Sequence, residues 1–302
     1  MNKEFYSNGK LLLSGEYAVL DGAVAWAIPT KFGQYLSVSN DESTQLSWKS
    51  LDEKGNLWFE ATYTINNLEE IATSNRNTSE TLQNILVAVR ELNPGFLSDY
   101  NGYTVKTELT FPRDWGLGSS STLINNIANW SKVNAHQLLS KTFGGSGYDI
   151  ACAQHDTPIL YQINKGLPIA EEIHKNPPFT EVLYFVYLNK KKNSREAINA
   201  YRNIDIDTSA LVGQISKITK RMVTSSRIDD FEQLMTLHEQ VLSEALGIPT
   251  IKAELFQDYT GAIKSLGAWG GDFILATGNE ASMEYFRKKG YNTVIPYSEM
   301  IL

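Results

Sequence analysis

The segment GLGSSST, residues 116–122, has the residue types of a phosphate-binding loop. Two glycines allow several backbone N–H groups to turn toward one point, and a helix beginning here would add unpaired N–H groups and the positive end of its dipole. The consecutive hydroxyls of Ser119, Ser120 and Ser121 suit phosphate oxygens or Mg²⁺. The alternative is a serine-capped helix after a flexible turn. The Gly-Lys-Ser/Thr ending of the standard P-loop is absent.

Two further glycine-rich segments contain or precede polar side chains. In GGSGYDIA, residues 144–151, Asp149 follows three glycines, and a carboxylate there can accept or orient the proton of an attacking hydroxyl. An aspartate in a turn also commonly caps the backbone, which is the alternative interpretation. In SLGAWGGDFILATG, residues 265–278, three glycines precede an apolar strand. That turn is either a tight connection or a second close approach of the backbone to a ligand.

The segment NGKLLLSGEYAVLDGAVAW, residues 8–26, predicts a strand that leads into a site. Its leucines, Leu11 to Leu13, indicate a buried strand, and Gly15 then indicates a backbone conformation that a side chain would obstruct. A simple first strand would need no such glycine, lysine, glutamate and tyrosine around it.

The elements that position these segments begin with antiparallel strands. Residues 5–65 contain alternating or apolar runs separated by Gly, Asp and Asn, which predicts strands with short turns. Residues 79–92 predict an amphipathic helix, capped by Ser79 or Thr78, and a strand is predicted at 103–111. The apolar positions of the helix have the spacing i, i+3, i+4, i+7: Leu82, Ile85, Leu86 and Val89.

The second half of the chain is predicted to be richer in helix. Residues 208–223 and 229–247 have helical periodicity, and the second helix is expected to end at Gly247, before Pro249. His238 lies among apolar residues of that helix, where a histidine is usually structural.

A boundary between two lobes is predicted near residue 170. Residues 158–163 and 181–188 are predicted strands, and the prolines and charges of NKGLPIAEEIHKNPP, between them, favour a surface connection. We therefore expect an α+β fold in two lobes, with an N-terminal domain at residues 1–170 and a C-terminal domain at residues 171–302.

Composition restricts the class of protein. The chain has 302 residues, 42% of them hydrophobic, and a formal charge of −7, which suits a folded protein and argues against general binding to nucleic acid or anionic membranes. No run of 18 apolar residues and no apolar segment behind a basic N-terminal flank occurs, so a cytoplasmic protein is expected. The one cysteine, Cys152, excludes an intrachain disulfide and is predicted to be a buried small hydrophobe. The four histidines lack metal-ligand spacing.

Taken in order, four segments resemble the motifs of the GHMP small-molecule kinases, which include galactokinase, homoserine kinase, mevalonate kinase and phosphomevalonate kinase. The segments are GKLLLSGEYAVLDG, PRDWGLGSSST, GSGYDIA and LGAWGGDF, and they span roughly residues 8 to 278. The resemblance implies a two-lobed fold whose N-terminal lobe has a β-α-β crossover and whose C-terminal lobe is ferredoxin-like. It also implies phosphoryl transfer from ATP, with Mg²⁺, to a small metabolite.

The resemblance assigns roles to particular positions. Asp149 matches the catalytic aspartate, and Lys10 would polarise the acceptor hydroxyl and stabilise that carboxylate. Ser120 matches the hydroxyl that touches Mg²⁺. The loop expected to wrap the ATP phosphates comprises Gly116, Leu117, Gly118, Ser119, Ser120 and Ser121. The acceptor side is expected to comprise Glu16, Tyr17, Gly147, Gly270, Gly271 and Asp272.

Details within the family favour the mevalonate-pathway kinases. The tyrosine of GEYAV and the aspartate of GGDF are most similar to phosphomevalonate kinases, and NKKKNSREAI, residues 189–198, is similar to a segment of the mevalonate-pathway kinases. The basic residues of that run are suited to an anionic substrate, and a solvated loop is the alternative. They are Lys190, Lys191, Lys192 and Arg195.

Other positions depart from the family pattern. Gln137 lies where mevalonate kinases have a glutamate that helps to hold Mg²⁺, and Ala268 with Trp269 interrupts the last glycine string. These departures keep two alternatives open: a non-catalytic regulator that binds nucleotide or metabolite on the same scaffold, and a diphosphomevalonate decarboxylase. The expected partner is a hydroxylated or phosphorylated small molecule, without nucleic acid or membrane, and family dimers suggest a homodimer.

Overall fold

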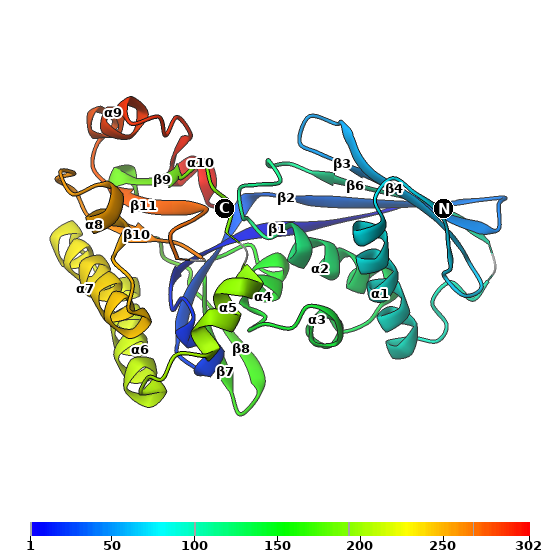
Figure 1. The fold of residues 1–302 in the computed structure, drawn as a ribbon, viewed down its shortest axis with the longest axis horizontal. Coiled ribbons are helices and arrows are strands. Elements are labelled where there is room, and N and C mark those ends of the chain that lie inside the picture. Colours follow the sequence, from blue (N-terminus) through cyan, green and yellow to red (C-terminus); the bar gives the residue numbers. More distant parts are fainter. Residues whose placement is uncertain (1, 100, 193, 268) are drawn as a thin grey trace. The chain divides into compact units, whose positions relative to one another are not determined.

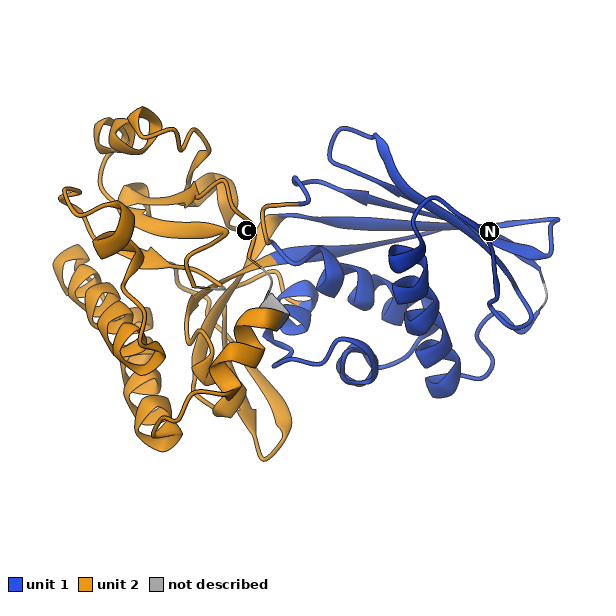
Figure 2. Ribbon diagram, viewed as in Figure 1, with its two compact units in different colours: residues 1–9, 32–113, 117–154 blue, residues 10–31, 114–116, 155–302 orange. Residues whose placement is uncertain are grey.

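The computed structural model describes residues 2–99, 101–192, 194–267 and 269–302. The chain forms two compact units, drawn in different colours in Figure 2. Unit 1 comprises residues 1–9, 32–113 and 117–154, and unit 2 comprises residues 10–31, 114–116 and 155–302. The boundary predicted near residue 170 lies within unit 2, inside strand β8 (Leu167–Glu172). A division into domains at that residue stays a prediction.

Unit 1 is built on strands that include one parallel pair. Strand β3 pairs in parallel with β6, with Trp48 opposite Val105, while β3 with β4, β4 with β5, and β2 with β6 are antiparallel. A parallel pair needs a crossover connection, and helix α1 lies in that connection. The β-α-β crossover implied by the resemblance is therefore present. Four strands lie wholly in unit 1: β3 (Gln45–Leu51), β4 (Leu57–Thr64), β5 (Glu70–Thr73) and β6 (Gly102–Leu109). Of β1 (Lys3–Ser14) and β2 (Ala25–Asp41), residues 3–9 and 32–41 belong to unit 1.

The helices of unit 1 pack on one face of these strands (Figure 1). They are α1 (Arg76–Leu92), α2 (Ser119–Ser131), α3 (Ala135–Thr142) and α4 (Tyr148–Gln154). Apolar side chains of the strands and helices form one core, to which Trp48 and Leu86 belong. The predicted cap of α1 is wrong. Asn75 caps the helix by accepting a hydrogen bond from the Thr78 N–H at 3.0 Å, whereas Ser79 is buried and its hydroxyl bonds that of Tyr63.

Unit 2 contains a four-stranded antiparallel sheet with the order β10-β11-β9-β12. In chain order, helices follow strand β9, strands β10 and β11 come next, and one helix connects β11 to β12. This is the ferredoxin-like arrangement. The strands are β9 (Leu183–Tyr187), β10 (Ile263–Ser265), β11 (Phe273–Thr277) and β12 (Val294–Pro296). The helices are α5 (Ser194–Arg202), α6 (Thr208–Thr224), α7 (Ile228–Leu246), α8 (Ile251–Leu255), α9 (Glu280–Lys288) and α10 (Tyr297–Met300).

Unit 2 also contains a second set of paired strands. Residues 25–27 of β2 pair with β7 (Ile159–Asn164), which pairs with β8. The expectation that residues 164–178 only connect two strands is therefore wrong in part, because Leu167 to Glu172 form the second strand of a hairpin. Two short 3₁₀ helices, η1 (Ala18–Asp21) and η2 (Thr180–Val182), complete the elements.

Several sequence-based predictions are confirmed. Helix α7 ends at Gly247, whose φ of +66° gives the left-handed cap, and Cys152 is fully buried. The α+β fold class with a crossover and a ferredoxin-like sheet is also confirmed. Among the residues that the structure describes, no helix is both long and apolar enough to span a membrane.

Candidate functional site

The start of α2 in unit 1 forms a surface suited to an anion. Gly118 is the N-cap residue with a left-handed φ of +90°, and no side chain caps the helix. The first turn therefore presents backbone N–H groups at the positive end of the helix dipole. The side chain of Ser120 is exposed, whereas that of Ser121 is buried and donates a hydrogen bond to the Gly118 carbonyl at 2.8 Å.

A buried polar face holds α2 in this position, and sequence reasoning missed it. Thr122 Oγ1 donates to Gln34 Oε1 at 2.8 Å, and Asn126 Nδ2 donates to the Gln34 carbonyl at 2.8 Å. The hydroxyl of Ser7, in β1, also donates a hydrogen bond to Asn126 Oδ1 of α2 at 2.8 Å. All four residues are buried, so each bond lies away from water and helps to fix the helix. The signal in the sequence is the Asn-Asn pair inside an otherwise apolar helix.

Asp149 lies in the first turn of α4, also in unit 1. Gly147 precedes it with a φ of +81°, and Asp149 Oδ1 accepts a hydrogen bond from the Ile150 N–H at 3.0 Å. The aspartate is half-buried, and so is His136. Burial lowers the pKa of His136, while the charge of Asp149 raises it, which indicates that the imidazole and the carboxylate interact.

In unit 2, Lys10 lies beside Gly116 and Asp272. Lys10 Nζ donates a hydrogen bond to the Gly116 carbonyl at 2.9 Å. Gly116 has a φ of +67°, and a Cβ there would lie 2.3 Å from Asp272 Oδ2. Only a glycine allows the backbone to approach the carboxylate this closely. The structure thus brings together three of the predicted residues, which are 106 or more positions apart in the sequence.

Asp272 is surrounded by charges of both signs, the positive Lys10 and Lys191 and the negative Asp114. Asp272 is 7% exposed, and its Oδ1 accepts a hydrogen bond from the Lys192 N–H at 3.2 Å, while its backbone N–H donates to the Lys190 carbonyl at 2.7 Å. Burial raises the pKa of Asp272, and the charges of Lys10 and Lys191 oppose that rise. The backbone φ of Asp272 is +53°, a conformation that few non-glycine residues adopt.

The last glycine segment packs against the basic run. Gly270 has a φ of +75°, and a Cβ on Gly271 would lie 2.0 Å from Lys192 Cγ. The two glycines are therefore required for the close packing of these segments of unit 2. Ala268 and the Arg195 side chain, also named in the sequence analysis, lie outside the described residues.

Glu16 and Tyr17 are held by side-chain and backbone groups of unit 2. Glu16 is 1% exposed, and Lys264 Nζ donates to its Oε1 at 2.5 Å. The Tyr17 hydroxyl accepts a hydrogen bond from the Trp269 N–H at 3.0 Å, and its ring stacks on that of Tyr201 at 5.3 Å. Contact of Glu16 and Tyr17 with a substrate stays a prediction.

Trp269 is part of the core of unit 2. Its side chain is 7% exposed and belongs to an apolar cluster with Leu211 and Leu242. The indole Nε1 donates to the Pro249 carbonyl at 3.0 Å. Packing therefore accounts for this residue, which interrupts the glycine string.

The residues present fit a nucleotide better than a protein-held metal. Within the described parts of the chain, no group of three or more His, Cys, Asp or Glu residues could hold a metal ion. The uncapped turn of α2 suits phosphate oxygens, and Mg²⁺ commonly binds substrate phosphates together with few protein ligands. The exposed Ser120 hydroxyl is the protein group expected to reach such an ion.

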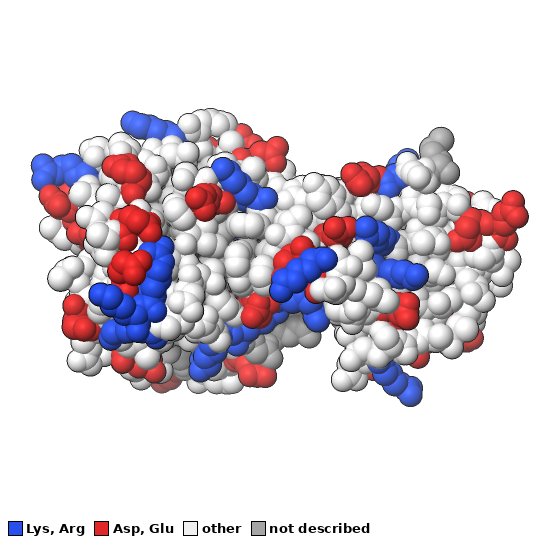
Figure 3. All heavy atoms as spheres, turned by 90° about the horizontal axis from the view of Figure 1, so that it is seen from above, with Lys and Arg blue, Asp and Glu red and all other residues white. Residues whose placement is uncertain are grey.

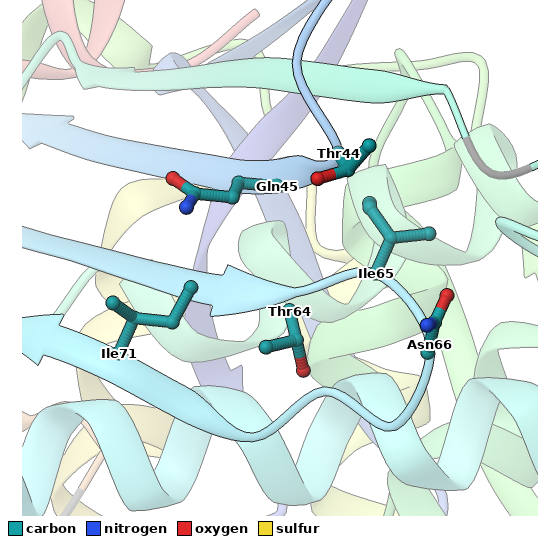
Figure 4. A pocket seen from close by; sticks show the side chains of 6 residues that line it. All are labelled: Thr44, Gln45, Thr64, Ile65, Asn66 and Ile71. Atoms are coloured by element: carbon teal, nitrogen blue, oxygen red, sulfur yellow. The ribbon is translucent and has the colours of Figure 1, made fainter.

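Other surface features have no part in this arrangement. A pocket of about 410 Å³ in unit 1 is lined by neutral side chains from the ends of β3, β4 and β5 (Figure 4), and none of the predicted site residues lines it. The face drawn in Figure 3 shows acidic and basic side chains interspersed.

Comparisons with known proteins show the fold. Scans against protein-family models and curated proteins found no match. Among solved structures, the chain is similar to a mevalonate kinase from Methanococcus jannaschii, with a TM-score of 0.70, 17% identity, and 98% of this chain and 97% of that chain covered. A Streptococcus pneumoniae phosphomevalonate kinase in complex with phosphomevalonate and AMPPNP gives a TM-score of 0.69 at 14% identity, with 95% of each chain covered. A Lactococcus lactis galactokinase complexed with galactose gives 0.66 at 14% identity, covering 95% and 88%.

The fold is thus similar to that of solved structures named as small-molecule kinases, as the resemblance in the sequence implied. The three similar structures carry the names of kinases for different acceptors, so the likeness itself favours no one acceptor.

Proposed function

We propose that the chain is an ATP-dependent kinase that transfers the γ-phosphoryl group to a hydroxyl or phosphate of a small metabolite, with mevalonate or phosphomevalonate as acceptor. The observation that carries the proposal is the uncapped start of α2, with Gly118 in a left-handed conformation and three serines in the first turn. Its support is a fold shared over nearly the full length with kinases.

The residues of unit 1 would bind the donor and take the acceptor proton. The N–H groups of residues 119–121 would bind phosphate oxygens. The hydroxyl of Ser120 would hold Mg²⁺ together with oxygens of the phosphates. When bound, Mg²⁺ supplies positive charge that offsets the charge of the phosphates. As the acceptor oxygen bonds to the γ-phosphorus and the bond to the ADP oxygen breaks, Asp149 would accept the proton of a hydroxyl acceptor, whereas an ionised phosphate acceptor has no proton to lose.

The residues of unit 2 would bind the acceptor. Lys10 lies beside Asp272, which is buried, and the charges of Lys10 and Lys191 both interact with its carboxylate. The positive charges of Lys10 and Lys191 favour an acceptor that carries a carboxylate or phosphate, and Asp114 is the negative charge that opposes them. Mevalonate and phosphomevalonate both meet that requirement, whereas neutral sugars do not.

The test is ADP release with Mg·ATP and a panel of acceptors: mevalonate, phosphomevalonate, homoserine and galactose. We expect turnover with one anionic acceptor, and its loss in Asp149→Asn. The matched control is Asp205→Asn, because Asp205 is exposed and belongs to none of the motifs. Turnover by Asp149→Asn at the wild-type rate would contradict the assigned role of this carboxylate.

Two other functions give different outcomes in the same assay. A regulator would bind ATP without transferring phosphate to any acceptor, and this alternative is favoured by the exposed Gln137 on α3, where the resemblance implies a metal-binding glutamate. A diphosphomevalonate decarboxylase would release CO₂ from diphosphomevalonate.

A further inference from the structure

Four ionisable side chains are buried together beneath the turn that follows β1. Glu16, His238, Glu239 and Lys264 are each between 0 and 3% exposed and come from the turn, from α7 and from β10 of unit 2. Lys264 Nζ lies 2.5 Å from Glu16 Oε1 and 3.9 Å from Glu239 Oε1. Buried charges are strongly destabilising unless they are paired, so the charge balance of this cluster matters.

His238 does not add a second positive charge. Its Nε2 accepts a hydrogen bond from the Gly15 N–H at 3.1 Å, so that nitrogen carries no proton. Burial, and then the charge of Lys264, lower the pKa of His238 well below its usual value. Among the described residues of the cluster, Lys264 is therefore the one positive charge facing the carboxyl groups of Glu16 and Glu239.

A single proton on the two carboxyl groups would make the cluster neutral. Glu239 Oε1 has no hydrogen-bond partner in the described structure, and Glu16 Oε2 has none either but lies 3.2 Å from Nε2 of His238, the nitrogen that accepts from the Gly15 N–H. These two carboxyl oxygens are where such a proton can reside. Glu239 is farther from Lys264 than Glu16 is, and its Oε2 already accepts a hydrogen bond from the Ser265 hydroxyl at 3.1 Å. Burial raises the pKa of Glu239 to about 8, Lys264 opposes this rise, and Glu16 adds to it. Burial also raises the pKa of Glu16.

The cluster joins two of the glycine-rich segments of unit 2. Gly15, at the turn, has a φ of +102°, and a Cβ there would lie 2.6 Å from the Ala25 Cβ, so the turn is closely packed. Lys264, on the other side, is in β10, which leads directly into the loop at residues 267–272. Thus the contact between Glu16 and Lys264 connects the turn that follows Lys10 to the strand that precedes Asp272.

We propose that Glu16, Glu239 and Lys264 form a buried positioning cluster in which the two carboxyl groups share one proton, and that this proton keeps the first glycine turn attached to β10. Glu16 then acts through Lys264. The effect on the reaction rate rests on the proposed kinase function, whereas the proton count does not.

The cluster predicts a response to alkaline pH. Above about pH 8, Glu239 ionises and competes with Glu16 for Lys264, which weakens the attachment of the turn. The neighbouring titratable groups keep their charge in this pH range. His238 is already neutral, and Tyr17 stays protonated because burial raises the pKa of its hydroxyl. If the deprotonated form is inactive, acceptor kcat/KM falls about tenfold one pH unit above the pKa.

Infrared difference spectroscopy between about pH 6 and pH 9.5 tests the shared proton directly. In the wild type we expect the carbonyl band of a buried protonated carboxyl group, which disappears at the higher pH. Glu239→Gln and Glu16→Gln should each lack the band, because the remaining carboxylate alone balances Lys264. Glu244→Gln is the control, since Glu244 is exposed on the same helix, and it should keep the band. Absence of the band in the wild type, or its persistence in either cluster variant, would overturn the proposal.

The pH profile of kcat/KM tests the positioning role. Glu239→Gln, which preserves the pair of Glu16 and Lys264, should remove the alkaline fall, and Glu244→Gln should retain it. A wild-type fall that is unchanged in Glu239→Gln would refute the positioning role. If no acceptor is turned over, the proposed function fails, and the infrared result still decides the proton count.

Discussion

Replacing Gly116 with alanine should be among the most destabilising glycine substitutions in unit 2. A Cβ at this position would lie 2.3 Å from Asp272 Oδ2 and 2.4 Å from its Cγ. The short Asp272 side chain could make room only by leaving its hydrogen bond with the Lys192 N–H. A left-handed non-glycine residue costs about 1–2 kcal/mol, and an overpacked buried site costs about 1–3 kcal/mol more. We expect a total loss of about 2–5 kcal/mol in the free energy of unfolding.

Gly267 provides a matched control beside the same carboxylate. Its φ is +70°, nearly equal to the +67° of Gly116, but a Cβ there would lie at an ordinary 3.7 Å from Asp272 Oδ2. Gly267→Ala should therefore show only the backbone strain of about 1–2 kcal/mol. The difference between the two variants isolates the contact with Asp272.

Urea unfolding at neutral pH, followed by intrinsic fluorescence, gives both free energies. A second measurement combines Gly116→Ala with Asp272→Ala, which removes the obstructing carboxylate and should recover part of the loss. Equal losses for the two single variants, to within about 0.5 kcal/mol, would show that the Asp272 carboxylate is not packed on Gly116. That result would refute the described geometry of this part of unit 2.

Three further predictions concern single side chains. Ser121→Ala removes the hydrogen bond to the Gly118 carbonyl and should destabilise the protein by about 1 kcal/mol in urea unfolding. Ser120 is exposed, so Ser120→Ala should change stability by under about 0.5 kcal/mol, but it should weaken Mg·ATP binding in calorimetry. Equal stability losses in the two variants would contradict this. Trp269→Phe removes the bond to the Pro249 carbonyl at a cost of about 1 kcal/mol, and Trp269→Ala should cost about 3–5 kcal/mol, so unfolding midpoints near that of the wild type would show that this indole is not packed as described. Because the pKa of Asp272 is raised on folding, the folded state binds more protons above the usual pKa, and stability falls as pH rises. Asp272→Asn should therefore gain stability relative to the wild type as pH rises above about 4 in urea unfolding, and a constant difference would refute the shift.

Local patterns in the sequence were sufficient to predict much of the fold. The periodicity of α6 and α7 and the stop at Gly247 depend on neighbouring residues, and the structure confirms them. Strand β8 was missed because its prolines and glutamates resemble a surface connection, whereas it forms an exposed edge of a hairpin with β7. The cap of α1 was misplaced because a hydroxyl residue three or four positions inside the helix also looks like a cap, and burial of Ser79 was not visible in the sequence.

The candidate site was predictable only where glycines mark it. The glycine-rich segments located Lys10, Gly116 and Asp272, which the structure places side by side in unit 2. The partnership of Glu16 with Lys264 could not be predicted, because 248 positions separate the two residues and neither belongs to a local pattern that names the other. Long-range pairing of charges depends on the fold, and the sequence shows only that such residues exist.

The most direct test of the central claim is phosphoryl transfer by the purified protein, measured as ADP release and as ³²P transfer from γ-labelled ATP to mevalonate or phosphomevalonate. We predict a labelled acceptor with the wild type and with Asp205→Asn, and none with Asp149→Asn although that variant remains folded. Binding of Mg·ATP with no labelled acceptor would contradict the kinase function and favour the regulator.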